Sequence, residues 1–175
     1  AQANDPTYPA GPIRLLVGFA PGGGVDLLAR GVAKKLQEQF GQPVIVENRP
    51  GAGSTIAAAA VARAKPDGQT LLFNSIAQSI NQGLYPNLPF DTVKDFVAVS
   101  PVATAPNAIS AHPSAPFKTL AEMVAYAKKH PGQVSYGAVG GSTTMYLGMA
   151  MLESQAGIKM NYVPYNGTVP SVMAA

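Results

Sequence analysis

The sequence contains no cysteine among its 175 residues. This absence excludes disulfide bonds, thiol catalysis, iron–sulfur clusters and cysteine-ligated zinc. No apolar stretch reaches the ~20 residues needed to span a bilayer, so we expect a protein that is not embedded in a membrane. Charged residues make up only 12% of the chain, about half of the roughly 25% that is usual in globular domains.

Basic residues are scattered along the chain, although the formal net charge is +3. The doublets Lys34-Lys35 and Lys128-Lys129 both fall in expected helices, where solvated helix faces explain them. A nucleic-acid site would need a denser basic patch with exposed aromatic residues. We therefore expect no nucleic-acid partner, while the weak positive field favours an anionic ligand.

The sequence also lacks recognisable catalytic machinery. His112 and His130 are its two histidines, and neither has a partner at metal-ligand spacing. There is no Gly-x-Ser-x-Gly nucleophile elbow, no Walker phosphate loop and no Gly-x-Gly-x-x-Gly dinucleotide motif. The nine carboxylates are dispersed. We expect a protein that is not an enzyme and that uses no metal or cofactor.

A glycine turn between an apolar run and a helical pattern occurs twice. Residues 13–19 lead into the triplet 22–24 and a helix, and residues 134–139 lead into Gly140-Gly141 and a second helix. The N–H groups at a helix N-terminus have no intrahelical partner and carry partial positive charge, so they can hold an anion. The repetition predicts a protein that grips a small carboxylate between two lobes.

The order of the expected elements is typical of an α/β fold. Because strands alternate with helices, we expect parallel sheets with right-handed crossovers and ligands beyond the carboxyl ends of the strands. We place the lobe boundary near Pro101 and Pro106, which gives a first lobe at residues 1–102 and an incomplete second lobe at residues 103–175. The expected strands are 13–19, 44–47, 70–74, 134–137 and 159–163, and the expected helices are 26–40, 55–64, a segment after a capping box at Thr119 and Glu122, and 143–156.

Polar residues at the expected strand ends have two interpretations. Asp26 either opens the first helix or accepts hydrogen bonds from a ligand or an ordered water. Asn74, Ser75 and Gln78 form either a polar loop or ligand contacts. The alternative function is a Rossmann-like enzyme that binds a phosphorylated substrate at the first glycine turn.

The two ends of the sequence carry expectations of their own. Residues 1–11 are polar and lack the basic and apolar regions of a signal peptide. We expect a mature secreted protein, and the alternative is a cytoplasmic protein with its first residues trimmed. Residues 169–175 look like the first turn of a helix, so we expect a C-terminally truncated chain. A third possibility is a fragment without a competent site that associates through uncovered apolar surface.

Several motifs together resemble the Bug family, the periplasmic solute receptors of the tripartite tricarboxylate transporter system. They run in family order over nearly all of the chain. The resemblance implies a type II-like periplasmic binding protein with two lobes, each a mostly parallel sheet flanked by helices. Such a receptor closes on a small organic acid, namely a carboxylate, a dicarboxylate or an amino acid. The motifs are Tyr8 to Leu15 with Phe19 to Asp26, Val46 to Gly53, and Val163 to Gly167, supported by Pro66 to Leu72 and Val93 to Phe96.

The resemblance also implies partners and binding residues. The receptor would work in the periplasm without a cofactor and pass its ligand to membrane transporter subunits. Three positions depart from the family: Val25 replaces Thr or Ser, Tyr146 replaces His, and Asn166 replaces Lys or Arg. These changes predict a socket for a less charged or differently shaped ligand. The positions that match the family's ligand-binding loops are Phe19, Ala20, Pro21, Gly22, Gly23, Gly24, Asp26, Asn74, Ser75, Gln78, Gly141, Ser142, Thr143, Thr144, Tyr165, Asn166, Gly167 and Thr168.

Overall fold

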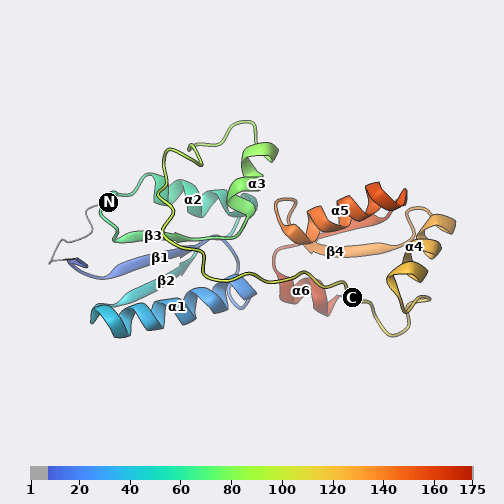
Figure 1. The fold of residues 1–175 in the computed structure, drawn as a ribbon, viewed down its shortest axis with the longest axis horizontal. Helices are drawn as coiled ribbons and strands as arrows, with labels where there is room; N and C mark the ends of the chain where they lie inside the picture. Colours follow the sequence, from blue (N-terminus) through green and yellow to red (C-terminus); the bar gives the residue numbers. More distant parts are fainter. Residues whose placement is uncertain (1–7, 175) are drawn as a thin grey trace. The chain divides into compact units, whose positions relative to one another are not determined.

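The computed structural model describes residues 8–174. The chain forms two compact units, the first reaching to Ala98 and the second beginning at Val99 (Figure 1). Each unit contains its own parallel sheet, as the sequence predicts. The expected boundary after residue 102 falls in the same segment, which has no helix or strand. Within the described range, no helix is long and apolar enough to cross a membrane.

The sheet of the first unit has three parallel strands in the order β2-β1-β3. The central strand is β1 (Ile13–Val17), with β2 (Val44–Asn48) on one side and β3 (Thr70–Phe73) on the other. Every residue of β1 except Arg14 is buried. A strand that is paired at both edges and covered on both faces needs such an apolar run.

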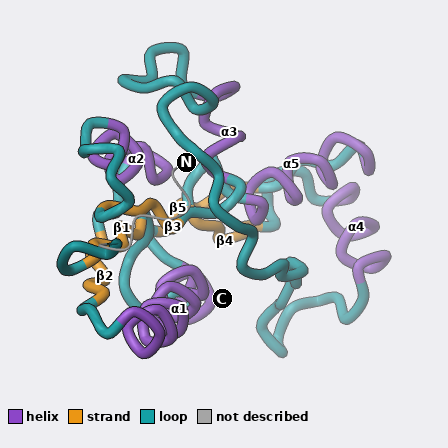
Figure 2. Tube along the Cα trace, turned by 60° about the vertical axis from the view of Figure 1, so that its left-hand side comes forward, coloured by secondary structure: helices purple, strands orange, loops and turns teal. Residues whose placement is uncertain are grey.

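Two helices cover opposite faces of this sheet (Figures 1 and 2). α1 (Gly24–Phe40) packs its buried alanines on the face that carries Leu15. α2 (Thr55–Ala62) packs Ala58 on the face that carries Leu72. The change of face accounts for the strand order, because right-handed crossovers over opposite faces move in opposite directions along a sheet.

The helices of the first unit differ in detail from those expected. α1 begins two residues before Asp26 and ends at Gly41, which has a left-handed φ of 68°. A short 3-10 helix, η1 (Ala52–Ser54), precedes α2. The segment after β3 is not only a loop, because α3 (Ala77–Leu84) begins there. α3 was not predicted from the sequence because no side chain caps its start and half of its residues are Gln, Ser or Asn.

The second unit has a two-stranded parallel sheet of β4 (Ser135–Val139) and β5 (Asn161–Tyr165). α4 (Leu120–Lys129) and α5 (Thr144–Ala156) pack on one face of this sheet. The expected capping box of α4 is confirmed, since Thr119 and Glu122 cap one another. The buried residues of this core are Met123, Ala127, Met149, Ile158 and Met160.

The opposite face of the second sheet carries α6 (Thr168–Met173). A Cβ placed on Gly137 of β4 would lie 2.8 Å from Ser171 Oγ and 2.9 Å from the Tyr165 ring. The side chain of a neighbouring β4 residue, Tyr136, packs instead into the core with α4 and α5. Since successive strand residues point to opposite faces, α5 and α6 lie on different sides of the sheet.

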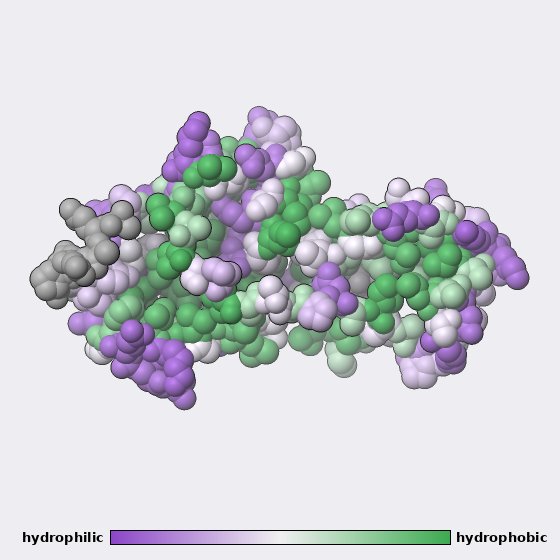
Figure 3. All heavy atoms as spheres, in the orientation of Figure 1, coloured by the Kyte–Doolittle hydropathy of each residue, from purple (hydrophilic) through white to green (hydrophobic). Residues whose placement is uncertain are grey.

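A long segment between α3 and α4 is exposed to solvent. Residues 97–114 are exposed throughout and contain neither helix nor strand. Val97 and Val99 are each 83% exposed. Figure 3 shows apolar residues at the surface of both units. This segment is unusual, because β-branched apolar residues are normally found on pleated, half-buried surfaces.

Candidate functional site

The carboxyl ends of the three strands of the first unit lie side by side. The register pairs Val17 with both Asn48 and Phe73, so the turns that follow all leave from one edge of the sheet. The predicted binding positions 19–26 and 74–78 therefore share this edge. The strand order makes the boundary between β1 and β3 a topological switch point, which is where α/β proteins bind ligands.

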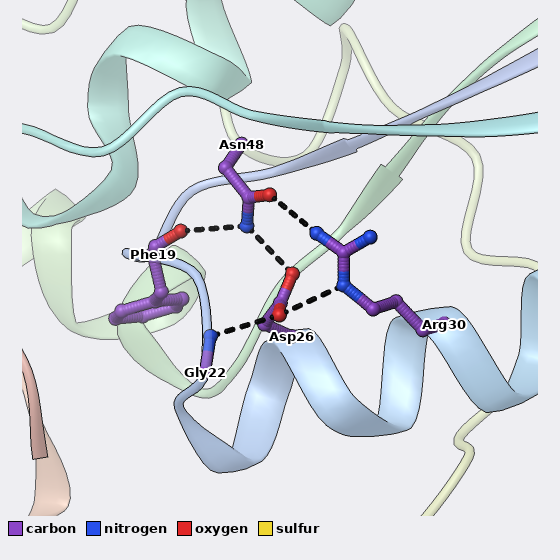
Figure 4. A network of polar contacts seen from close by, with 5 residues as sticks. All are labelled: Phe19, Gly22, Asp26, Arg30 and Asn48. Atoms are coloured by element: carbon purple, nitrogen blue, oxygen red, sulfur yellow. Dashed lines mark hydrogen bonds and ion pairs between the residues drawn. The ribbon is translucent and has the colours of Figure 1, made fainter. Parts of the chain in front are cut away.

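Asp26 lies inside the first glycine turn and holds its shape (Figure 4). Its Oδ2 accepts hydrogen bonds from the Gly22 N–H and from Arg30 Nε, each at 2.9 Å. Its Oδ1 accepts from Asn48 Nδ2 at 2.8 Å. The same Asn48 nitrogen donates to the Phe19 carbonyl at 3.1 Å. These contacts tie the turn to both α1 and the end of β2.

The charge of Asp26 is balanced locally. The hydrogen bond from Arg30, with those from Gly22 and Asn48, lowers the pKa of Asp26 to about 2 against the opposing effect of burial. The Asp26 side chain is 2% exposed, whereas that of Arg30 is 52% exposed. The turn thus contains a buried carboxylate that is paired with Arg30. The other donors to this carboxylate, the Gly22 N–H and Asn48 Nδ2, are neutral.

The N-terminal amides of α1 are open to a ligand. Gly23 is the N-cap residue in an extended conformation, and no side chain in residues 8–174 caps this helix. Gly22 has a φ of 82°, which glycine adopts without strain. A Cβ at Gly22 or Gly24 would meet nothing within 4 Å. Uncapped amides beneath open space are what an anion socket requires.

A chain of hydrogen bonds fixes the turn after β3. Ser54 Oγ and the Ser75 N–H each donate to Asn74 Oδ1 at 2.9 Å, and Asn74 Nδ2 donates to Gln78 Oε1 at 3.1 Å. Ser54 lies over Gly18, the residue after β1, where an added Cβ would be only 1.7 Å from its Oγ. Ser54 thereby connects the turn after β1 to the turn after β3.

Some buried polar atoms at these strand ends have no hydrogen-bond partner among the described residues. They include Gln78 Nε2 and Asn81 Oδ1 in α3, and Ser142 Oγ before α5. Asn81 uses its Nδ2 to donate to the Gly53 carbonyl at 2.7 Å. An unpaired buried polar group costs about 1–3 kcal/mol and calls for an explanation. Both units therefore contain buried polar atoms near their predicted binding turns that could form hydrogen bonds to a ligand.

The second glycine turn is held by a threonine rather than by an acid. Thr143 Oγ1 donates to the Val139 carbonyl at 2.5 Å and accepts from the Tyr146 N–H at 3.4 Å, which caps α5. Ser142 is 1% exposed. No charged side chain occurs at the predicted positions 141–144 and 165–168. This half of the candidate site thus offers amides and hydroxyls only.

The turns after β4 and β5 leave from the same edge of the second sheet, because Val139 pairs with Tyr165. The predicted binding residues of this unit are thereby neighbours. Gly167 is the N-cap residue of α6. Thr144 Oγ1 donates to Asn107 Oδ1 at 3.2 Å, which connects the start of α5 to the exposed segment 97–114.

Three tyrosine rings, one each from β4, β5 and the first turn of α5, lie close together. The Tyr162 ring centroid is 5.5 Å from that of Tyr136 and 4.7 Å from that of Tyr146. Burial, followed by the charge of Glu153, raises the pKa of Tyr136 to about 12, and burial also raises the pKa of Tyr162. The phenols of Tyr136 and Tyr162 therefore stay neutral at physiological pH.

Sequence reasoning missed several residues that shape these turns. Arg30 had a detectable signal, since it follows Asp26 at the i,i+4 spacing of helical ion pairs. Asn48, Ser54, Asn81 and Asn107 reach the turns from distant segments, and only the fold brings them there. No cluster of three His, Asp or Glu side chains suited to a metal occurs in residues 8–174.

Two parallel α/β units, each with helix N-termini at the carboxyl edge of its sheet, define a type II-like periplasmic binding protein fold. Comparison with known proteins specifies the family. The model of the tripartite tricarboxylate transporter family receptor matches residues 28–175. The chain belongs to this family, which confirms the resemblance drawn from its motifs.

Individual relatives agree with this assignment. A UPF0065 protein of Bordetella pertussis is 40% identical over 99% of this chain, and Protein BugT of the same organism is 35% identical over 99%. The chain spans 54% of each relative. Among solved structures, "R. palustris Rpa4515 with adipate" superimposes with a TM-score of 0.90 at 31% identity, over 95% of this chain and 56% of that one. MatC from Rhodopseudomonas palustris, described with bound malate, gives a TM-score of 0.82 at 29% identity, over 95% and 57%.

Proposed function

We propose that this chain forms part of a periplasmic receptor that captures a small organic acid for a tripartite tricarboxylate-type transporter. One observation carries the proposal: each unit ends a parallel strand in a glycine turn that leads into a helix N-terminus. Backbone amides at such positions attract a carboxylate through their unpaired N–H groups and the helix dipole. Binding of this kind requires no catalytic group.

The relatives support the ligand class. One neighbouring structure is described with adipate and another with malate, both of them dicarboxylates. Each unit has one glycine turn that could meet a carboxylate. We propose that the amides of Gly23, Gly24 and Val25 form the carboxylate-binding position of the first unit, and that Ser142 and the N-terminus of α5 form that of the second unit.

The chemistry of the turns bears on the charge of the ligand. Arg30 is engaged by Asp26, and the predicted positions of the second unit carry no cation. A ligand carboxylate would therefore be balanced by neutral donors and helix dipoles. The two carboxylate oxygens of Asp26 already accept three hydrogen bonds. We therefore propose that Asp26 stabilises the turn and does not contact the ligand.

The test is an NMR titration of the chain with adipate and with malate. A separate titration with inorganic phosphate tests the alternative, a site for a phosphorylated substrate. Saturable amide shifts should occur at residues 22–25 and 142–144 with a dicarboxylate. Shifts with phosphate alone would favour a phosphorylated substrate and contradict the proposal. Absence of shifts with both acids would also contradict it for this chain.

Two threonine variants provide a matched comparison. Thr143 and Thr119 are both N-cap residues whose side chains accept a backbone N–H, but only Thr143 lies at a glycine turn. Thr143→Ala and Thr119→Ala should each lower the free energy of unfolding by about 1 kcal/mol. Only Thr143→Ala should weaken the dicarboxylate titration. Equal titrations in the two variants would remove Thr143 from the site.

A further inference from the structure

The bend between β5 and α6 contains a residue pair that is chemically reactive. Asn166 and Gly167 form this bend, because β5 ends at Tyr165 and α6 begins at Thr168. They are the one Asn-Gly pair in the sequence. Glycine after asparagine favours attack on the side-chain amide, since a residue without a Cβ leaves its backbone nitrogen accessible. We propose that Asn166 is a site of spontaneous deamidation, which converts it into a negatively charged residue.

The reaction requires only water besides these two residues. The Gly167 backbone nitrogen loses its proton and attacks Cγ of Asn166. The new C–N bond closes a cyclic imide, and the bond from Cγ to the side-chain nitrogen breaks. The departing NH2 group takes up the proton and leaves as ammonia. Water then opens the imide at either carbonyl, which gives aspartate or isoaspartate, and both products carry a carboxylate.

Both reacting groups are free in the part of the chain that the structure describes. Asn166 is exposed, and its side chain forms no hydrogen bond with any residue in the range 8–174. The Gly167 N–H has no backbone acceptor in that range either. The pairing of β5 with β4 ends one residue earlier, with Val139 opposite Tyr165. Closure of the imide therefore breaks no hydrogen bond of these groups.

The turn after β3 shows the protected arrangement of a similar pair. Asn74 is followed by Ser75, which is also small, but the Ser75 N–H donates to Asn74 Oδ1 at 2.9 Å. Ser54 Oγ donates to the same oxygen at 2.9 Å, and Asn74 Nδ2 donates to Gln78 Oε1 at 3.1 Å. The nitrogen that would attack and the amide that would leave are thus both hydrogen-bonded. Attack at Asn74 must first break these contacts.

Fixed neighbours on both sides make the bend sensitive to this change. Tyr165 lies against Gly137, where an added Cβ would be 2.9 Å from the tyrosine ring. The Gly167 carbonyl accepts from the Ser171 N–H at 3.3 Å. Isoaspartate adds one CH2 group to the main chain between these contacts. Its formation would therefore displace the start of α6 as well as add a charge.

The added charge would alter the candidate site of the second unit. The predicted positions 141–144 and 165–168 carry no charged side chain. A carboxylate at residue 166 would introduce a negative charge where an anionic ligand is expected, and like charges repel. This consequence rests on the proposed function, whereas the conversion itself depends on no ligand.

The test follows each asparagine by peptide mass spectrometry while the folded 175-residue chain is incubated in neutral and in alkaline buffer. Residue 166 should gain the mass that replacement of NH by O adds, faster in alkali because the attacking nitrogen must lose its proton. In water labelled with heavy oxygen, the label should enter this residue. Asn74, which is hydrogen-bonded, and exposed Asn87, which precedes Leu88, are internal controls. Both should convert at least ~10-fold more slowly, a barrier difference of about 1.4 kcal/mol.

Two variants isolate the closure of the imide. Gly167→Ala places a Cβ beside the attacking nitrogen, and the extended φ of −170° at this position is accessible to alanine. It should slow conversion at least ~10-fold. Asn166→Gln keeps an exposed amide but requires a larger ring, so it should release much less ammonia from this position. Circular dichroism verifies that each variant is folded, and Asn166→Gln decides if Gly167→Ala is not.

Three results would overturn the proposal. The first is an intact amide at residue 166 in the folded chain while the urea-unfolded chain converts. The second is conversion of Asn74 or Asn87 as fast as that of Asn166. The third is conversion at the parent rate in a folded variant.

The effect on binding has a separate measurement. Asn166→Asp should weaken the malate titration of residues 142–144 about 5-fold, as expected for one exposed like charge. An unchanged titration would contradict this effect. A parent chain that does not titrate would contradict the proposed function, while the mass measurement still decides whether Asn166 converts.

Discussion

The central strands of the two units, β1 and β4, differ in how far they are buried. In β1, Ile13 and Val17 are fully buried and Leu16 is 1% exposed. In β4, Ala138 is the only buried residue. Each strand precedes a glycine turn and a helix, so the local architecture is the same. In the part of the chain that the structure describes, the more deeply buried strand is the one with lateral neighbours at both edges, since β1 has a strand on each side and β4 pairs with β5.

The two units also differ in backbone strain. Ala52 and Ser54 in the first unit have positive φ values of 44° and 76°, and no other non-glycine residue in the described range does. This conformation costs an L-residue roughly 1–2 kcal/mol. In this conformation Ser54 lies over Gly18, and its Oγ is within hydrogen-bond distance of Asn74. The turns of the first unit thus include two residues in an unfavourable backbone conformation. The glycine turn of the second unit is held by the side chain of Thr143, which caps α5.

The largest expected effect concerns the glycines that other elements approach. Gly18→Ala places a Cβ 1.7 Å from Ser54 Oγ and 2.9 Å from the Ser54 Cα, so backbone must move. We expect a loss of about 3 kcal/mol in the free energy of unfolding, at the upper end for overpacking. For Gly137→Ala the three nearest atoms all belong to the side chains of Ser171 and Tyr165, so a loss of about 1–2 kcal/mol is expected. Urea unfolding of both variants measures the difference.

Two controls accompany the glycine variants. Gly31→Ala adds a Cβ in α1 that meets nothing within 4 Å, so it should stabilise the helix by up to about 1 kcal/mol. The double variant Gly18→Ala with Ser54→Gly frees the crowded space and should recover part of the loss. A Gly18→Ala protein as stable as Gly31→Ala would refute the close approach of Ser54.

The next effect follows from Asp26, the buried acid that only the first turn possesses. Its folded-state pKa of about 2 lies below the ordinary value of 3.8. The carboxylate therefore contributes stability that is complete above pH ~4 and is lost as the pH falls toward 2. We expect this contribution to be about 1–2 kcal/mol, because the partner Arg30 is half exposed.

The variant Asp26→Asn isolates this contribution. The amide cannot accept from three donors as the carboxylate does, so the variant should be less stable at pH 7. Between pH 4 and pH 2 it should lose less stability than the parent chain. Parallel stability curves for the two proteins over this range would show that Asp26 is not the titrating group.

The smallest effect tests the difference in strain. Ala52→Gly in the first unit relieves a left-handed residue, and we expect a gain of about 0.5 kcal/mol after the entropy of glycine in the unfolded chain is subtracted. The same substitution at exposed Ala125, inside α4 of the second unit, should cost about 1 kcal/mol. Thermal unfolding of the pair should give shifts of opposite sign, and shifts of the same sign would contradict the assignment of strain to Ala52.

Local patterns in the sequence predicted most elements and few of the contacts at the candidate site. The apolar run before Gly18, the stripe of α1 and the capping box at Thr119 indicated strands and helices within a few residues of their observed ends. α3 escaped because its start has no side-chain cap. The ligand-binding roles assigned to the glycine turns remain predictions.

What the sequence by itself determined is the parallel α/β character and the two glycine turns, because these depend on the spacing of neighbouring residues. The receptor family was indicated separately, by the resemblance of its motifs to those of the family. Only the tertiary structure decided that Asn48 and Arg30 would lock Asp26 into its turn and that Ser54 would reach Asn74. It also decided that, among the described residues, β1 pairs along both of its edges while β4 pairs along one. The physical reason is that hydrogen bonds and strand pairing join atoms close in space, and their distance in space follows from crossover handedness and helix packing rather than from sequence separation.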